Sequence, residues 1–297
     1  MEELVRSDLA MECEGATEGH GVRVQRSRVG ALEILRVQIC TDEAAQRLNK
    51  PVGRYITVQS DEHCRLNDGQ FDRLRCALAV ELRELSERMC ERRIGRGFSV
   101  LVAGLGNREI TPDAIGPETV RRLSVTRHLH HENALFSTVG LCEISAIAPG
   151  VTGQTGLETV EMIRAAAGAV RPDLVIAVDA LAARSVERLC ATVQLCDSGI
   201  QPGSGLGSRH KALSKETVGV PVMGVGVPTV VDSSVLMYGA LQKAGMSEPS
   251  EELRRALQAG KGFFVSPKEI DLQVSVAATL LASALEKAFD VGERLLN

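Results

Sequence analysis

The segment Leu174-Val-Ile-Ala-Val-Asp179-Ala-Leu-Ala-Ala-Arg184 decides the fold class of this chain of 297 residues. Its first five residues are apolar, which is typical of a strand buried on both faces of a parallel sheet. A second apolar run, Phe98–Ala103, leads into Gly104-Leu-Gly-Asn107 and then Thr111-Pro-Asp113-Ala-Ile-Gly-Pro117. Each run leads toward an Asp, so the sequence predicts an α/β fold with two carboxylates at the carboxyl ends of core strands.

The remaining pattern predicts a mostly parallel central sheet that is covered by helices on both faces. In residues 67–93 the apolar side chains recur every three or four positions, which indicates a helix. The motif Ser266-Pro-Lys-Glu269 has the residue types of a helix N-terminus, so we expect a closing helix that reaches Leu295. Further strands are expected at Leu141–Ala146, Thr192–Leu195 and Val220–Val225, and further helices at Pro117–Leu123, Leu157–Val170 and Val231–Lys243.

The first third of the chain has a different character. Residues 5–21 are polar and rich in Gly and Glu, so we expect a mobile arm. Strand-like runs follow at Ala31–Ile39 and Arg54–Val58, and they predict a hairpin or a sheet edge. This part is therefore expected to be a β addition to the α/β core.

Composition and charge exclude several classes of function. The net charge of −4 and the absence of a long Lys or Arg run predict no direct binding of nucleic acid. No apolar stretch approaches the length of a bilayer, and Met1–Arg6 lacks the features of an export signal, so we expect a cytoplasmic protein without membrane contact. The eight cysteines show no metal-ligand spacing, and we expect unpaired buried thiols.

Asp113 and Asp179 are the candidate catalytic residues. Each taken alone is interpreted as a helix N-cap, because a turn of helix is expected soon after it. Two carboxylates at one sheet edge can instead share a proton: one acts as base on a water and the other donates to the carbonyl oxygen or the leaving group. That arrangement would hydrolyse an amide bond. Asp232 is a weaker candidate, as a third acid or as a helix cap.

Other kinds of site have less support. The turn after Phe98–Ala103 begins like a dinucleotide-binding loop, but Glu109 stands at the third glycine position, so we expect no cofactor. No serine, zincin or cysteine nucleophile motif is visible. We interpret His128-Leu-His130-His131 as a solvated helix end or loop, and Gly203–Gly207 as an anion cradle or a flexible loop.

Two alternatives to a pair of acids stay open. In the first, the same acids and a histidine such as His210 hold a divalent ion that activates water, which would make the chain a metal-dependent peptidase. In the second, the crevice at the sheet edge binds nickel or a peptide without any catalysis.

Several motifs in the same order resemble the germination protease of spore-forming bacteria. The resemblance runs from residue 98 to 240, returns at 263–271, includes Val5–Glu12, and is weak between about residues 14 and 97. It rests on Gly104–Asn107, Thr111–Pro117, Ser124–Leu129, Ala148–Gly153, Ile176–Ser185, Ser214–Gly219, Gly226–Asp232 and Phe264–Asp271.

The resemblance implies an endopeptidase that degrades small acid-soluble spore proteins during germination, inside the forespore or spore core. It also implies a fold similar to that of hydrogenase maturation proteases, a homotetramer, and an atypical aspartic mechanism without a metal or cofactor. The two acids of that mechanism carry over to Asp113 and Asp179.

The family is made as a zymogen, and the segment Asp8-Leu-Ala-Met-Glu12 resembles the sequence at which its pro-segment is removed. The resemblance therefore implies cleavage between Asp8 and Leu9. Residues 1–8 would be a propeptide and 9–297 a single protease domain, with 9–97 as the N-terminal addition and 98–297 as the catalytic core.

Overall fold

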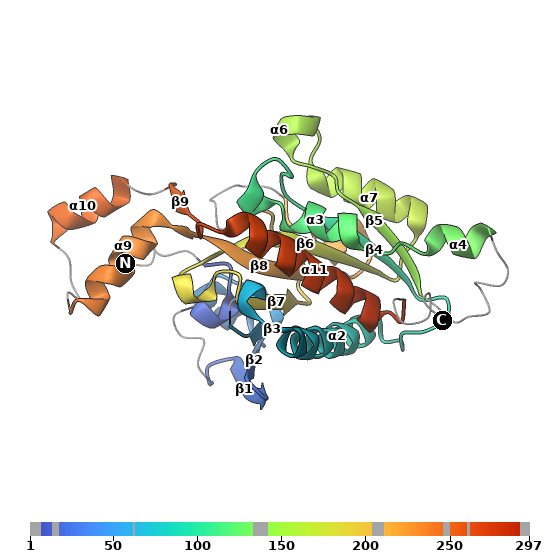
Figure 1. Cartoon of the computed structure of the whole chain (residues 1–297), viewed down its shortest axis with the longest axis horizontal. Helices are drawn as coiled ribbons and strands as arrows, with labels where there is room; N and C mark the ends of the chain where they lie inside the picture. The colour runs from blue at the N-terminus through green and yellow to red at the C-terminus, as the bar shows by residue number, and fades with distance from the viewer. Residues whose placement is uncertain are drawn as a thin grey trace.

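The computed structural model describes residues 7–13, 18–61, 63–132, 142–203, 211–245, 250–259 and 262–291. These residues form a nine-stranded mixed sheet with helices on both of its faces (Figure 1). The strands are β1 Val22–Val29, β2 Leu32–Ile39, β3 Gly53–Gln59, β4 Ser99–Gly104, β5 Glu143–Ile147, β6 Leu174–Ala183, β7 Thr192–Cys196, β8 Val222–Asp232 and β9 Phe264–Val265. The α-helices are α1 Asp42–Leu48, α2 Asp68–Cys90, α3 Ile115–Arg122, α4 Arg127–Glu132, α6 Thr152–Thr155, α7 Thr159–Val170, α8 Lys215–Val218, α9 Ser233–Lys243, α10 Glu251–Ala259 and α11 Ile270–Ala288.

The strand order is β1-β2-β3-β7-β8-β6-β4-β5, and β9 pairs with β8. Strands β8, β6, β4 and β5 are parallel to one another, as expected for the core. Strands β1, β2, β3 and β7 continue the same sheet in antiparallel fashion from the other edge of β8. The α/β fold with an N-terminal β addition is therefore confirmed. The complete sheet is mixed because β1–β3 of the addition, and also β7 and β9, pair in antiparallel fashion.

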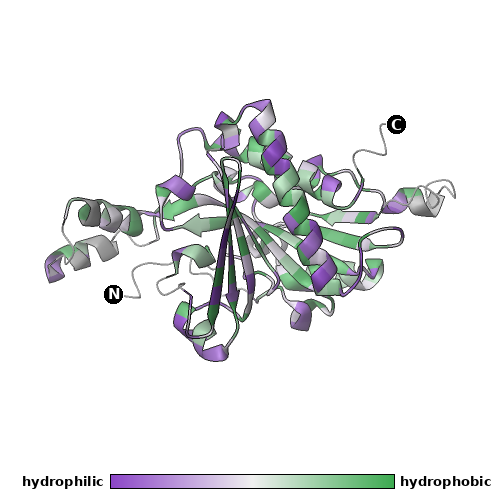
Figure 2. Cartoon of the chain, turned by 90° about the horizontal axis from the view of Figure 1, so that it is seen from below, coloured by the Kyte–Doolittle hydropathy of each residue, from purple (hydrophilic) through white to green (hydrophobic). Residues whose placement is uncertain are grey.

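Two apolar layers hold the helices against the sheet. Helices α2, α3 and α11 cover one face, where Leu78 and Leu281 pack with buried residues of β4 and β6. Helices α7 and α8 cover the opposite face, where Ile163 and Val218 pack against Val175 and its neighbours. Figure 2 shows the hydrophobic colour in the central strands, with hydrophilic residues on the outer surfaces of the helices. Both faces of β4 and β6 are thus buried, which explains their continuous apolar sequence.

The N-terminal arm differs from the expectation of a mobile segment. Leu9 is fully buried and Ala10 nearly so, because both side chains fill apolar clusters beside the sheet. The prediction of mobility is therefore wrong for the part of the arm between Asp8 and Glu12, which is docked. The polar strand β1 and the short helix α1 were not predicted, because the many polar residues of β1 and the few apolar positions in α1 give a weak pattern.

The closing helix also begins later than Ser266 suggests. Its N-cap residue is Glu269, and it ends at Ala288. Strand β9 ties Phe264 and Val265 to β8, so the next residues are used in a turn toward the helix. Leu295 lies outside the described residues.

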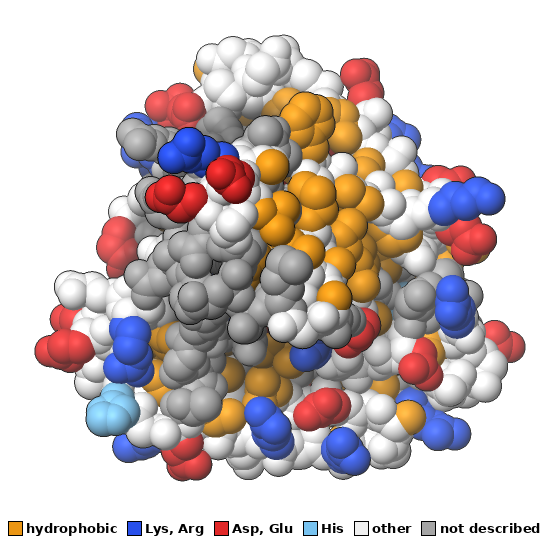
Figure 3. All heavy atoms as spheres, turned by 90° about the vertical axis from the view of Figure 1, so that its left-hand side faces the viewer, with side chains coloured by type: hydrophobic (Ala, Val, Ile, Leu, Met, Phe, Trp, Pro, Cys, Tyr) orange, Lys and Arg blue, Asp and Glu red, His pale blue; other side chains and the backbone are white. Residues whose placement is uncertain are grey.

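One end of the molecule exposes a group of hydrophobic side chains, which are seen together when the left-hand side of Figure 1 faces the viewer (Figure 3). The segments at this end include α9, α10 and β9. Phe263, Val265 and Met237 in or beside these segments are each at least 40% exposed.

Candidate active site

Asp113 is carried by a tight turn that follows β4. The chain leaves Gly104, passes through Gly106 with a left-handed φ of 105°, and returns in the 3-10 turn Thr111–Asp113 before α3 begins. The backbone N–H of Asn107 donates to Asp113 Oδ2 at 2.6 Å, which fixes the carboxylate over the turn. The glycines of this motif therefore shape a loop that holds Asp113 at the carboxyl end of β4.

Asp179 lies in the same region of the sheet, on β6. The ladder between β4 and β6 ends with the pair Gly104 and Val178, so Asp179 is the first β6 residue beyond the end of β4. Its side chain is buried, and the backbone N–H of Ala180 donates to its Oδ1 at 2.9 Å.

Neither acid caps a helix. The N-cap of α3 is Ala114, without a side-chain hydrogen bond, and Asp179 is inside a strand that continues to Ala183. The capping interpretation of Asp113 and Asp179 is therefore wrong. For Asp179 it failed because β6 continues through Ala183 and the short helix that follows is capped by Ser185; for Asp113 it failed because the carboxylate accepts from the Asn107 N–H instead.

The two carboxyl groups are close enough to interact. Burial raises the pKa of Asp179 well above its ordinary value, and the charges of Asp113 and Asp8 raise this pKa further. Burial also raises the pKa of Asp113, but the N–H of Asn107 opposes that rise. Asp179 is thus the acid that more readily keeps a proton, and Asp113 the one that more readily loses it.

The arm lies along the part of β6 that extends beyond Asp179. The Asp8 N–H donates to the Ala182 carbonyl at 3.0 Å, and the Ala182 N–H donates to Asp8 Oδ2 at 2.9 Å. The next side chain, Leu9, packs in a pocket of Leu181, Ala183, Leu189, Val231 and Val235.

The arm is held at a second point by Glu12. The backbone N–H groups of Arg184 and Ser185 donate to the Glu12 carboxylate at 2.7 and 3.1 Å. The sequence Asp8–Glu12 therefore docks in a single register, with its Asp and Glu carboxylates on backbone N–H groups of β6 and of the residues that follow it.

Two side chains that the sequence analysis did not select hold the carbonyl of Asp8. Lys50 Nζ and Gln194 Nε2 each donate to this oxygen at 3.0 Å. Lys50 follows α1, and Gln194 is a buried polar residue on β7. A glutamine within the buried strand Thr192–Cys196 was the one available sequence signal, whereas nothing in the sequence around Lys50 pointed to the site.

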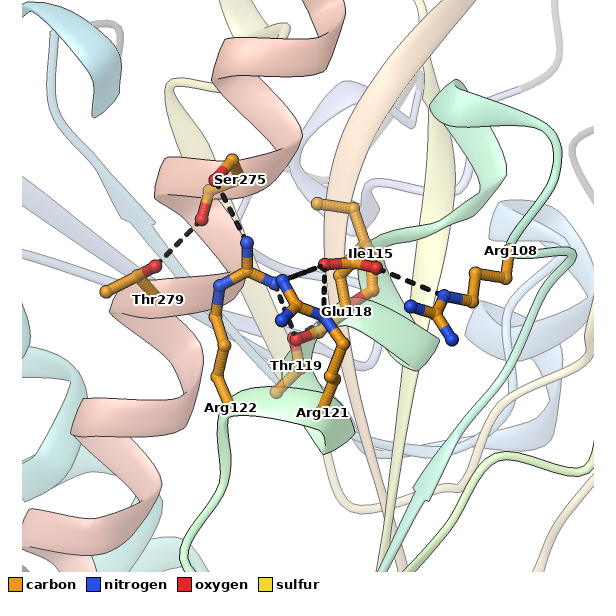
Figure 4. A network of polar contacts seen from close by, with 8 residues as sticks. All are labelled: Arg108, Ile115, Glu118, Thr119, Arg121, Arg122, Ser275 and Thr279. Carbon is orange, nitrogen blue, oxygen red and sulfur yellow. Dashed lines mark hydrogen bonds and ion pairs between the residues drawn. The ribbon is translucent and has the colours of Figure 1, made fainter.

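A polar network fixes the helix that follows Asp113 (Figure 4). Glu118 on α3 accepts hydrogen bonds from Arg121 and Arg122, and Arg108 approaches it to 3.5 Å. Arg122 also donates to Ser275 of α11 at 2.9 Å. Glu118 thus joins the loop after β4, helix α3 and helix α11, and so supports the turn that carries Asp113.

The other candidates do not join this site as catalytic groups. Asp232 accepts hydrogen bonds from the backbone N–H and the hydroxyl of Ser234 at the start of α9, as expected if Asp232 is a helix cap. His128 lies on α4, whereas His210 and Ser204–Gly207 lie outside the described residues. Among the described residues, no group of three or more His, Cys, Asp or Glu could hold a metal ion. In the same part of the chain, no helix has the length and hydropathy needed to span a membrane.

The family model and the relatives that follow agree on one family. The model of the germination protease family matches residues 2–242. Germination proteases of Clostridium acetobutylicum and of a Geobacillus species are each 35% identical to the chain, over 97% and 96% of it and over 97% and 93% of their own lengths. That of Caldanaerobacter subterraneus is 34% identical over 97% of the chain and 95% of its own length. These matches include residues 14–97, where the motifs alone showed little resemblance.

A solved NiFe hydrogenase maturation protease from Thermococcus kodakarensis is also similar, at 17% identity and a TM-score of 0.33, over 63% of this chain and 92% of that one.

Proposed function

The chain belongs to the germination protease family and is a peptidase, and on that premise we propose that it is an aspartic endopeptidase, made as a zymogen, in which Asp113 and Asp179 form the catalytic pair. Its substrates are small acid-soluble spore proteins, and it works in the forespore or spore core as a homotetramer. No cofactor is required. The observation that carries this proposal is the pair of interacting carboxyl groups, Asp179 buried and Asp113 half-buried, beside a docked peptide segment of the chain itself.

The environment of each acid sets its role in hydrolysis. Ionised Asp113 takes a proton from a water molecule, whose oxygen attacks the carbonyl carbon of the bound peptide. Protonated Asp179 gives its proton to the nitrogen of the leaving amine when the C–N bond breaks. The proton on Asp113 then returns to Asp179, and the pair is ready for another cycle.

The docked arm supports cleavage between Asp8 and Leu9. Asp8 lies near enough to Asp179 to raise its pKa, and the carbonyl of Asp8 is held by two donors. Under this proposal residues 1–8 are the propeptide, and 9–297 form one protease domain with an addition at 9–97 and the catalytic core at 98–297. The continuous sheet that joins both parts supports the single domain.

The exposed apolar group of Figure 3 supports the proposed assembly. Phe263 is 69% exposed, and hydrophobic side chains gathered on one face are typical of a surface that contacts another protein. We place contacts between copies of the chain at this end.

Mass spectrometry of the intact purified chain tests the proposal. After mild acidification, the wild type is expected to lose residues 1–8 and to yield new termini at Asp8 and Leu9. The Asp113→Asn and Asp179→Asn variants are expected to stay whole while they keep the wild-type circular dichroism spectrum. A wild type that stays whole, or either variant that is cut at a rate near that of the wild type, would contradict the proposed pair.

A further inference from the structure

We propose that Lys50 and Gln194 form the oxyanion-binding site of this enzyme: they hold the carbonyl oxygen of the residue before the scissile bond and stabilise the negative charge that develops on it. This inference rests on the proposed cleavage between Asp8 and Leu9. It assigns a catalytic contribution to the N-terminal addition, since Lys50 belongs to residues 9–97.

The sheet register places Gln194 opposite the catalytic pair. Asp179 on β6 pairs with Gly226 on β8, and Gly226 pairs with Gln194 on β7. Directly paired residues point to the same face of a sheet, so Asp179 and Gln194 point to the same face on either side of Gly226. Their backbones are about 10 Å apart, which is two strand spacings. Gly226 has no side chain. The Asp8 carbonyl accepts a hydrogen bond from Gln194, and the Asp8 carboxylate, held by the Ala182 N–H, is close enough to Asp179 to raise its pKa.

Gln194 fixes the peptide on both sides of Leu9. Its Nε2 donates to the Asp8 carbonyl at 3.0 Å, and its Oε1 accepts from the Ala10 N–H at 2.7 Å. Both functional groups of the buried amide are therefore used by the bound segment. A side chain that merely filled space on β7 would need neither.

Lys50 brings a positive charge to the same oxygen. Helix α1 ends at Leu48, its C-cap residue Asn49 has a left-handed backbone, and the Lys50 N–H then donates to the Ala45 carbonyl at 3.1 Å. This C-terminal cap turns the chain so that Lys50 Nζ reaches the Asp8 carbonyl at 3.0 Å. A fixed ammonium stabilises a developing alkoxide more strongly than it stabilises a neutral carbonyl.

The chemical step balances with these groups. When water attacks the Asp8 carbonyl carbon, a C–O bond forms, the water proton goes to Asp113, and the carbonyl π electrons move to the oxygen held by Lys50 and Gln194. When the C–N bond breaks, those electrons return to form the C=O bond, and the nitrogen of Leu9 takes the proton of Asp179. Lys50 and Gln194 thus stabilise charge without exchanging a proton.

Steady-state kinetics on a synthetic peptide of residues 5–12 test the assignment. Variants that do not process themselves are first processed with a trace of tagged wild type, which is then removed. Lys50→Met is expected to lower kcat about 10²–10³-fold with little change in KM, because the lost interaction matters most in the transition state. Gln194→Glu, which keeps the acceptor for Ala10 and loses the donor, is expected to lower kcat at least tenfold, and Lys50→Arg to retain more activity than Lys50→Met.

The matched control is Arg47→Gln, which removes a positive charge from α1. Arg47 donates to the His20 carbonyl and is expected to be dispensable for cleavage. A phosphinic analogue of the peptide, with an anionic tetrahedral phosphorus in place of the scissile amide, provides a second readout. Its inhibition constant is expected to rise about 100-fold in Lys50→Met and to stay unchanged in Arg47→Gln.

The outcomes separate this inference from the proposed function. A wild type that cuts the peptide, together with a Lys50→Met variant whose kcat stays within threefold of it, would overturn the oxyanion-binding site and leave the Asp pair standing. A rise in KM alone would also overturn it, since Lys50 would then serve only to bind the peptide. A wild type that cuts neither the peptide nor its own arm would overturn both.

Discussion

The backbone oxygen of Asp113 lies 2.0 Å from the point that a Cβ on Gly106 would occupy. Real Cβ atoms do not approach an oxygen this closely, and φ at Gly106 is also left-handed. The turn that presents the proposed base therefore requires glycine at this position on two independent grounds. This relation connects the motif Gly104–Asn107 directly to the chemistry of the site.

The first prediction concerns Gly106→Ala. The added methyl group must push Asp113 away from Asn107, so we expect a loss of about 1–3 kcal/mol in the free energy of unfolding and at least a tenfold loss in the rate of arm cleavage. Gly168→Ala on α7 is the control. A Cβ at this position meets nothing within 4 Å, so the substitution should leave activity unchanged. Urea unfolding and intact-mass kinetics measure both effects. Wild-type activity in Gly106→Ala would show that the turn does not position Asp113.

The second prediction uses the stability of Asp179→Asn. Burial and neighbouring charges raise the pKa of Asp179 in the folded protein. Between about pH 4, where an unfolded Asp titrates, and this raised pKa, the folded protein therefore binds more protons at Asp179 than the unfolded chain does. The wild type therefore loses stability as pH rises through this window, whereas the neutral amide does not. We expect the variant to melt a few degrees higher than the wild type at pH 7, and the difference to disappear near pH 4. A variant that melts lower than the wild type at pH 7 would contradict the raised pKa.

Sequence patterns predicted the core of the fold well because both faces of its strands are buried. The apolar runs before Asp113 and Asp179 correspond to β4 and β6, and the periodic helix at residues 67–93 corresponds to α2. The patterns failed where few side chains are buried or where packing, rather than propensity, decides the structure. Strand β1 is rich in Arg and buries little more than Val22, and the arm around Leu9 becomes ordered only because an apolar cluster formed by distant segments receives it.

The candidate site was predictable only in part, for a related reason. A carboxylate at the end of a core strand has a local signature, and Asp113 and Asp179 both have it. Lys50 and Gln194 reach the same peptide from an added segment and from an antiparallel strand, so their approach depends on strand order and register. Neither of these can be read from spacing along the chain.

The third prediction tests the network in Figure 4 through Glu118→Gln. Hydrogen bonds and charges from Arg121 and Arg122 hold the pKa of Glu118 below its ordinary value of 4.5, so its contribution to stability is present above that pH and is lost as pH falls through the lowered pKa. We expect Glu118→Gln to cost about 1–3 kcal/mol at pH 7, and the gap from the wild type to close in acid. Denaturant unfolding at pH 7 and pH 3 measures the gap. An equal gap at both values would mean that the charge of Glu118 plays no part.

The fourth prediction separates the acid pair from a metal-dependent mechanism. Two carboxyl groups that share a proton need no ion, so prolonged dialysis against a chelator is expected to leave the rate of peptide cleavage unchanged within error. Adding Zn²⁺, Mn²⁺ or Mg²⁺ back should then have no activating effect. Loss of activity on chelation with recovery on metal addition would favour the metal-dependent alternative.

The last prediction concerns the dependence of arm cleavage on pH. Catalysis by this pair requires protonated Asp179 and ionised Asp113, so the first-order rate should fall on the alkaline side as Asp179 loses its proton and on the acid side as Asp113 gains one. The charge of Asp8 helps to raise the pKa of Asp179, and the Asp8→Asn precursor should therefore show its alkaline limb at lower pH than the wild type does. The acid limb, in contrast, should move less. Intact-mass kinetics over pH 4 to 9, compared by the shape of each profile rather than its height, measure the shift. An alkaline limb that stays in place in Asp8→Asn would mean that the arm does not bring its carboxylate to Asp179 at the moment of cleavage.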